Sequence, residues 1–355
     1  MIKSIYKVVG VMSGTSLDGI DIVYATYSFD EKWKFNIHNT ITFPYSERWK
    51  KMLSDLPKES LEFLHNFDED YSAFLADQIR IFIDANKIVD IDFISSHGHT
   101  ALHQPENKLT YQIGNRQILA NILNQKVICD FRVQDVEYGG QGAPLVPIGD
   151  RLLFGEYDFC LNLGGFANIS FETNSNRIAY DICPVNIVLN HYVSQLNLEY
   201  DDKGSLASKG IINEELLTQL NKLEFYKAEP PKSLGLEWVK ANIIPLIDGI
   251  NLQTEDILRT FVEHIAVQIS KTISENDKSV LVTGGGAYND FLIRRIIDLS
   301  KADIVIPTKE IIEFKEALVF GLLGILKDRN EVNCLKSVTG ANKNHSSGKI
   351  LIPNT

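Results

Sequence analysis

Three consecutive stretches decide the fold: Val8-Val-Gly-Val-Met12, then Ser13-Gly-Thr-Ser-Leu-Asp-Gly19, then Ile20-Asp-Ile-Val-Tyr-Ala-Thr-Tyr27. The first is a short apolar run, which favours a strand. The last alternates apolar and polar residues, which is typical of a strand with one buried face. The seven residues between them are mostly small and contain two glycines. The pattern predicts a β-hairpin with a small-residue tip.

The second half of the chain opens in the same way. Phe159–Leu163 is predicted to be a strand, Gly164-Gly165 a tight tip, and Ala167–Phe171 the returning strand. Two strand–glycine tip–strand units, each followed by a long α/β stretch, predict an internally duplicated α/β architecture. The chain has 355 residues, a length that suits two lobes rather than one core.

We expect the first lobe over residues 1–136 and the second over 137–337, with 338–355 packing back on the first. The stretch Gly139-Gly-Gln-Gly-Ala-Pro144 is the predicted hinge, because Gly and Pro interrupt regular structure. Apolar residues at helical spacing predict helices around 49–56, 71–82, 257–269 and 292–297. Short apolar runs predict further strands at 91–94, 126–128 and 279–282.

Composition indicates a soluble globular protein. Hydrophobic residues make up 44% of the chain and charged residues 23%. The formal net charge of −11 disfavours binding to a nucleic-acid backbone, although a local nest of backbone N–H groups with a metal ion still accommodates ATP. The longest apolar stretch, Ala317–Leu326, is about half the length of a membrane-spanning helix, so we expect no membrane insertion.

The four cysteines contain no Cys-x-x-Cys pair and no metal-type spacing, so we expect reduced thiols. The first ten residues lack the apolar core of a secretion signal. Together these features predict a cytoplasmic protein.

The first hairpin tip has the groups that a phosphate needs. Backbone N–H groups and hydroxyls lie close together in such a turn, without Cβ atoms in the way. Asp18 is a candidate ligand of Mg²⁺, directly or through a water. An ordinary hairpin tip is the structural alternative. The candidate phosphate-binding residues here are Gly14, Thr15, Ser16, Asp18 and Gly19.

Two more glycine tips have the same chemistry. Gly164, Gly165 and Asn168 form the second, for phosphates. Gly284-Gly285-Gly286 lies between a predicted strand and a predicted helix, where a nucleotide can approach the backbone closely. The spacing is not G-x-G-x-x-G and lacks an acidic ribose partner, so a Rossmann dehydrogenase is a weak interpretation. No G-x-x-x-x-G-K-[ST] motif occurs, which argues against a P-loop enzyme.

Taken together, the three tips resemble the two phosphate loops and the adenosine loop of the actin/hexokinase/Hsp70 superfold. That resemblance implies two lobes of ribonuclease H-like topology with an ATP cleft between them.

A longer series of motifs runs through the chain in order. It comprises Gly10–Asp21; Ser96-His97-Gly98 with Thr100, His103 and Pro105; Gln112-Ile113-Gly114; Asp130-Phe131-Arg132 with Asp135; Gly139–Pro147; Leu161–Ser170; Asp202-Lys203-Gly204 with Ala207 and Gly210; Pro230-Pro231-Lys232-Ser233 with Gly235 and Glu237; Val282–Tyr288; Glu316-Ala317; and Ser337–Ala341. This series resembles the anhydro-N-acetylmuramic acid kinase family over nearly the whole chain.

The resemblance implies an enzyme that uses ATP and Mg²⁺. Its substrate, 1,6-anhydro-N-acetylmuramic acid, has a C1–O6 bridge and so no free 6-hydroxyl. Water attacks C1, while the released O6 takes the γ-phosphoryl group of ATP. The products are N-acetylmuramic acid 6-phosphate and ADP, a step of peptidoglycan recycling. The resemblance also implies a homodimer.

The family places its general base at the Asp of an Asp-Thr-Gly-Pro-Gly-Asn motif. The matching segment here is Asp181-Ile-Cys-Pro-Val-Asn186, which implies Asp181 as the base. A strand-end carboxylate that caps the turn before Pro184 is the structural alternative. The segment lacks the family's Thr and both Gly, and His99 stands where the family usually has Gln.

The other candidates for binding the sugar are His97, His99, Arg132, Gln141, Asn186 and Glu316. The planar fork of Arg132 suits the lactyl carboxylate, but a salt bridge explains this residue as well. Structural histidines and a glutamate that favours a helix dipole are the alternatives for His97 and Glu316.

Three other functions remain open at this point. The altered segment allows a kinase for another sugar, which a substrate panel would distinguish. It also allows a catalytically silent relative that binds sugar or nucleotide, although the retained Asp18 and Asp181 argue against this. An ATPase acting on protein partners would need interaction domains for which 355 residues leave little room.

Overall fold

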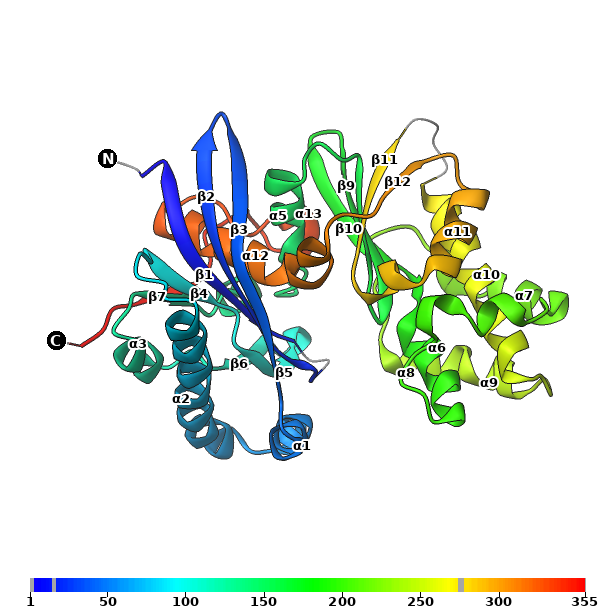
Figure 1. The fold of residues 1–355 in the computed structure, drawn as a ribbon, viewed down its shortest axis with the longest axis horizontal. Coiled ribbons are helices and arrows are strands. Elements are labelled where there is room, and N and C mark those ends of the chain that lie inside the picture. Colours follow the sequence, from blue (N-terminus) through cyan, green and yellow to red (C-terminus); the bar gives the residue numbers. More distant parts are fainter. Residues whose placement is uncertain (1–2, 15–16, 274–277, 355) are drawn as a thin grey trace. The chain divides into compact units, whose positions relative to one another are not determined.

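The computed structural model describes residues 3–14, 17–273 and 278–354. The chain divides into two compact units (Figure 1). Unit 1 comprises Met1–Leu153 and Phe314–Thr355, and unit 2 comprises Phe154–Glu313.

Unit 1 contains a six-stranded sheet in the order β13-β7-β4-β1-β2-β3. Strands β1 to β3 form an antiparallel meander, and β4 and β7 continue from β1 in parallel. A separate two-stranded sheet pairs β5 with β6. The strands are β1 (Ile5–Ser13), β2 (Gly19–Asp30), β3 (Lys32–Pro44), β4 (Phe93–Ser96), β5 (His99–Gln104), β6 (Leu109–Ile113), β7 (Val127–Cys129) and β13 (Lys349–Leu351).

Helices cover both faces of this sheet. Val9 and Val11 of β1 share an apolar core with α2 (Leu61–Ala85). Gly10 points to the opposite face, because successive residues of a strand alternate. There α12 (Lys309–Asp328) crosses so closely that a Cβ on Gly10 would lie 2.2 Å from the carbonyl oxygen of Ala317. The remaining helices of unit 1 are α1 (Glu47–Asp55), η1 (Leu56–Lys58), η2 (Pro105–Asn107), α3 (Gln117–Leu123), α4 (Val133–Glu137), α5 (Val146–Leu153) and α13 (Lys336–Thr339).

Unit 2 repeats the arrangement with a five-stranded sheet in the order β10-β9-β8-β11-β12. Again the first three strands form an antiparallel meander, and two parallel strands continue from the first. The duplication expected from the two glycine-tipped hairpins is therefore confirmed. The strands are β8 (Phe159–Leu163), β9 (Phe166–Thr173), β10 (Asn176–Pro184), β11 (Ser279–Thr283) and β12 (Asp303–Val305).

The core of unit 2 lies between its sheet and a long buried helix, α10 (Thr254–Thr272), which contributes Phe261 and Ile265. The other helices are α6 (Asn186–Val193), η3 (Ser194–Leu196), η4 (Asp202–Gly204), η5 (Ala207–Lys209), α7 (Glu214–Asn221), η6 (Glu224–Lys227), α8 (Leu236–Asn242), α9 (Ile244–Asp248), η7 (Gly285–Tyr288) and α11 (Asp290–Leu299). None of the helices in the described ranges is both long enough and apolar enough to cross a membrane.

The division between the units falls after Leu153 rather than after the expected residue 136. Residues 139–144, expected as a hinge, lie inside unit 1, where the Gly142 amide donates to Asp135. Lys315 of α12 forms a buried ion pair with Asp150 of α5, and both residues belong to unit 1, whose second segment begins at Phe314 rather than at the expected residue 338. The segment 338–355 also belongs to unit 1, and β13 pairs with β7.

Candidate active site

The hairpin tip of unit 1 begins where β1 ends. Ser13 Oγ donates a hydrogen bond of 2.7 Å to the carbonyl of Gly98, which anchors the start of the tip. Asp18 is exposed. Gly19 has a structural explanation, since a Cβ there would lie 2.5 Å from the Phe43 carbonyl oxygen of β3. Of the other candidates, Gly14 is half-buried, and Thr15 and Ser16 lie outside the described residues.

His97 and Arg132 form a hydrogen-bonded pair in unit 1. His97 Nδ1 lies 2.7 Å from the Gly98 carbonyl, and since a carbonyl only accepts, this nitrogen carries the proton. Nε2 then accepts from Arg132 Nε at 2.7 Å. Burial and the Arg132 charge hold the pKa of His97 well below its usual value. His97 is therefore a neutral side chain that orients Arg132.

The pairing limits how Arg132 can hold an anion. Its Nε is occupied by His97, and Nη1 donates at 2.6 Å to the Gly142 carbonyl. The remaining N–H groups lie at the Nη1/Nη2 end of the fork, so a carboxylate would bind there end-on. Burial lowers the pKa of Arg132, and the charge of Glu316 opposes that shift. Gln141, exposed, immediately precedes Gly142.

His99 is buried beside the hairpin tip, with its ring 6.1 Å from that of Tyr71. Burial lowers the pKa of His99 to about 4, against the opposing effect of the Gly14 and Ser13 backbone. At neutral pH it is uncharged, so like the family's Gln it is a neutral polar group. Its Nδ1 has no hydrogen-bond partner within the described ranges.

A row of polar side chains crosses the sheet of unit 2. Thr283, Asn162, Asn168 and Asp181 are direct partners on β11, β8, β9 and β10. Direct partners share one face of a sheet. Asn168 and Asp181 were predicted from the sequence, whereas Asn162 and Thr283 were missed. The available signal was a single polar residue near the end of each apolar strand.

Asp181 is held at one oxygen and available at the other. Oδ2 accepts from the Leu234 amide at 2.8 Å, and the Asp181 amide donates to the Lys232 carbonyl at 3.1 Å. Within the described ranges Oδ1 has no hydrogen-bond partner. Burial raises the pKa of Asp181, although the Leu234 hydrogen bond acts against this. A carboxylate with a raised pKa and an open oxygen is suited to accept a proton.

The altered residues after Asp181 do not cover it. Ile182, Cys183 and Val185 are all buried and belong to the apolar core of unit 2. Asn186 follows them as the first residue of α6, and its side-chain amide donates to the Leu163 carbonyl at 3.2 Å.

The two glycine tips of unit 2 meet at the end of β8. Gly284 has φ +81°, and a Cβ there would lie 2.6 Å from Asn162 Oδ1. A Cβ on Gly286 would lie 2.7 Å from the Leu163 side chain. Gly285 is exposed, and Asn186 Nδ2 lies 3.8 Å from the position of its Cβ. Gly165 has open space beside it, since the atom nearest to a Cβ there is 3.8 Å away, whereas a Cβ on Gly164 would lie 3.2 Å from Asn162 Nδ2.

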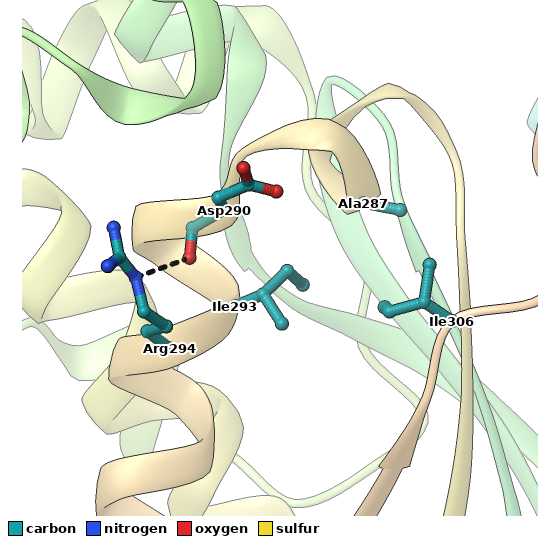
Figure 2. Close-up of a pocket in the computed structure, with 5 residues that line it drawn as sticks. All are labelled: Ala287, Asp290, Ile293, Arg294 and Ile306. Carbon is teal, nitrogen blue, oxygen red and sulfur yellow. Dashed lines mark hydrogen bonds between the residues drawn. The ribbon is translucent and has the colours of Figure 1, made fainter.

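A cavity of about 390 Å³ lies beside this glycine turn, entirely within unit 2. Figure 2 shows Ala287, Ile293 and Ile306 pointing into it, with Asp290 and Arg294 at its polar side. Arg294 Nε donates to the main-chain carbonyl of Asp290 at 3.3 Å. The sequence predicted the glycines as nucleotide-binding residues, but it predicted none of these five residues as part of the site.

Two copies of one five-stranded arrangement, each opening with a glycine-tipped hairpin, place the chain in the actin/hexokinase-like class of α/β folds. Residues 6–353 match the family of anhydro-N-acetylmuramic acid kinases, and the chain belongs to this family.

Two curated relatives are similar to this chain along nearly their whole length. The chain is 32% identical to the anhydro-N-acetylmuramic acid kinase of Photobacterium profundum, over 98% of this chain and 99% of the relative. It is 34% identical to that of Francisella tularensis subsp. novicida, over 96% and 97%. Among solved structures, the activator of the 2-hydroxyisocaproyl-CoA dehydratase from Clostridium difficile with bound ADPNP aligns with a TM-score of 0.45 and 13% identity, over 91% of this chain and 96% of that one.

Proposed function

We propose that this chain hydrolyses the 1,6-anhydro bond of 1,6-anhydro-N-acetylmuramic acid and phosphorylates O6 with ATP. Water forms the new bond to C1, the C1–O6 bond breaks, and O6 forms a bond to the γ-phosphorus. The bond from that phosphorus to ADP breaks, and the proton of the water goes to a base. The products are N-acetylmuramic acid 6-phosphate and ADP. The full-length family match supports this reaction.

The proposed mechanism rests on the hydrogen bonding and burial of the Asp181 carboxylate. Its Oδ2 is fixed by the Leu234 amide, which orients the carboxylate, while Oδ1 is left to meet a water. Burial raises the pKa, and this makes the carboxylate a stronger base. We assign Asp181 as the group that takes the proton from the attacking water.

The nucleotide is assigned mainly to unit 2. The cavity beside Gly284–Gly286 is large enough for an adenosine, and its apolar walls from Ile293 and Ile306 suit a base. In unit 2, Gly164, Gly165 and Asn168 are assigned to phosphates. In unit 1, the residues assigned to phosphates from the sequence are Gly14, Thr15, Ser16, Asp18 and Gly19. Asp18 offers exposed carboxylate oxygens of the kind that Mg²⁺ prefers. Bound Mg²⁺ would neutralise charge that develops on the phosphates.

The sugar is assigned to polar groups of unit 1, with Asn186 of unit 2. The end of the Arg132 fork would bind the lactyl carboxylate, and neutral His97 would hold that fork in place. His99, Gln141 and Glu316 would contact the hydroxyl and acetamido groups. The same proposal includes a role in peptidoglycan recycling in the cytoplasm and a homodimeric state, which sedimentation of the purified protein would test.

The decisive experiment combines phosphorus NMR with ¹⁸O-labelled water. The purified protein is incubated with 1,6-anhydro-N-acetylmuramic acid and MgATP in that water. Formation of the 6-phosphate with label at C1 would support the coupled reaction. Turnover of ATP only with another sugar would instead support a kinase of shifted specificity. Nucleotide binding without turnover of any sugar would support a silent relative.

Filling the adenosine cavity is expected to weaken nucleotide binding. Ala287→Trp places a large ring into a cavity of about 390 Å³, so we expect the Kd of ATP, from calorimetry, to rise at least about tenfold. Ile297→Trp on the exposed side of α11, the helix that lines the cavity through Ile293, is the matched control and should leave Kd unchanged. Equal effects of the two substitutions would contradict this location for the base.

The activity is expected to fall in mild acid. Asp181 acts as a base only when deprotonated, and burial raises its pKa above the usual value of about 3.9. Lowering the pH through this raised value therefore removes the base, and kcat/KM should fall with a slope of one. In a pH profile of kcat/KM, the apparent pKa of the acidic limb should lie above the ordinary range for aspartate. An apparent pKa at or below that range would contradict the assignment.

A further inference from the structure

Away from the residues assigned to the reaction, three metal-ligating side chains of unit 1 converge. Asp135 lies on α4, and Cys334 and His345 lie in the segment after α12. One ligand atom from each residue lies within 4.8 Å of the other two. All three side chains are buried, with relative exposures of 0% for Asp135, 1% for Cys334 and 6% for His345.

The backbone fixes two of these side chains on one face. Cys334 and His345 form an antiparallel bridge in which each amide donates to the other's carbonyl, at 3.1 and 3.2 Å. Residues paired in this way project their side chains to the same side. The thiol and the imidazole are therefore held together by the main chain.

The imidazole of His345 points a lone pair at a carboxylate. Its Nδ1 lies 3.1 Å from the Lys343 carbonyl, which only accepts, so Nδ1 carries the proton of the neutral ring. Nε2 then presents a lone pair toward Asp135 Oδ1, 3.5 Å away, and has no hydrogen-bond partner in the described part of the chain. Two buried lone pairs that face each other repel, and a cation between them, either a proton or a metal ion, removes this repulsion.

Asp135 is oriented as metal-binding carboxylates are. Oδ2 accepts from the Gly142 amide at 2.8 Å, and Oδ1 accepts from Thr339 Oγ1 at 2.7 Å. Such outer hydrogen bonds hold a ligand in position, and each oxygen keeps a further lone pair. Nitrogen and oxygen ligands of a tetrahedral zinc ion lie about 3.4 Å apart. The separation of 3.5 Å between His345 and Asp135 fits this value.

We propose that Asp135, Cys334 and His345 form a zinc site. A thiolate, an imidazole and a carboxylate are the ligand types of Zn²⁺, and the mixture with sulfur disfavours Mg²⁺ and Ca²⁺. Binding replaces the thiol proton of Cys334 with the metal. The ion would tie the C-terminal segment to the loop whose Gly142 carbonyl receives Arg132, so it would stabilise the part of unit 1 that positions this arginine.

The test uses the full chain, first treated with a chelator and then titrated with Co²⁺ as a spectroscopic substitute for Zn²⁺. We expect one Co²⁺ per chain, a thiolate-to-cobalt charge-transfer band, and loss of that band when Zn²⁺ is added. Cys334→Ser should abolish the band and weaken Zn²⁺ binding at least about 100-fold, and His345→Gln should weaken it at least about tenfold. Cys129 is another buried cysteine of unit 1, so Cys129→Ser is the matched control and should keep the band.

Thermal unfolding provides a second measurement that does not depend on activity. Zn²⁺ should raise the Tm of the unaltered protein but not that of folded Cys334→Ser, because binding to the native state alone stabilises it. Absence of the band in the folded, unaltered protein would overturn the proposal. So would a band that persists in Cys334→Ser, or one that Cys129→Ser also loses.

Discussion

Replacing Asp181 with asparagine is expected to lower kcat for the coupled reaction by about 10²–10⁴-fold, the usual contribution of a positioned general base. The amide has nearly the same shape as the carboxylate, and its oxygen can still accept from the Leu234 amide. The protein should therefore fold normally. What is lost is the ability to take a proton from water, so the effect should appear in kcat rather than in nucleotide binding.

The measurement is the rate of ADP formation with saturating sugar and MgATP, beside calorimetric binding of ATP to the same variant. Asp303→Asn on β12, an exposed aspartate of the same unit, is the matched control and should retain full activity. If Asp181→Asn kept kcat within about threefold of the parent, Asp181 would not be the base.

Gly10→Val is expected to cause the largest loss of stability, about 3 kcal/mol or more. A Cβ at this position would lie 2.2 Å from the Ala317 carbonyl oxygen and 3.2 Å from the Gly321 amide. Both are backbone atoms of α12, so no side chain can rotate away. Either the helix or β1 must move, and unit 1 loses the packing between them.

Urea unfolding followed by circular dichroism measures this effect. Gly165→Ala serves as the control for stability, because a Cβ there meets no atom closer than 3.8 Å. We expect its free energy of unfolding to stay within about 0.5 kcal/mol of the parent, as for an ordinary surface change. Similar losses in the two variants would show that the close approach of α12 does not determine the stability of unit 1.

The sequence was sufficient to predict the inner strands and the duplication. The strand at Phe159–Leu163 was predicted with the bounds that the structure has, because its apolar run ends at a pair of glycines. The outer strands β3 and β10 were not predicted. Polar residues are frequent in both strands. In addition, the register shifts once in each strand's pairing with its neighbour, which interrupts the alternation of buried and exposed residues. The unit boundary was also misplaced, because contacts of Asp135 and Asp150 with distant residues hold 137–153 in unit 1.

Less of the candidate site could be predicted from the sequence. Spacing alone could not choose Asp181 over other strand-end carboxylates, and the family resemblance was needed to do so. Asn162 and Thr283 could not be found, since their place beside Asp181 depends on the register between paired strands, and for Thr283 the paired strands are more than 100 residues apart. The walls of the cavity proposed for adenosine are similarly formed by separate elements, η7, α11 and the segment after β12.

One arrangement in unit 1 has a consequence for motion. The Gly98 carbonyl receives both Ser13 Oγ and His97 Nδ1, His97 Nε2 receives Arg132, and Arg132 donates to Gly142. One continuous series of hydrogen bonds thus links Ser13 at the end of β1 to Gly142. A shift of Ser13 at the end of β1 is therefore expected either to break one of these hydrogen bonds or to move the Arg132 guanidinium with it.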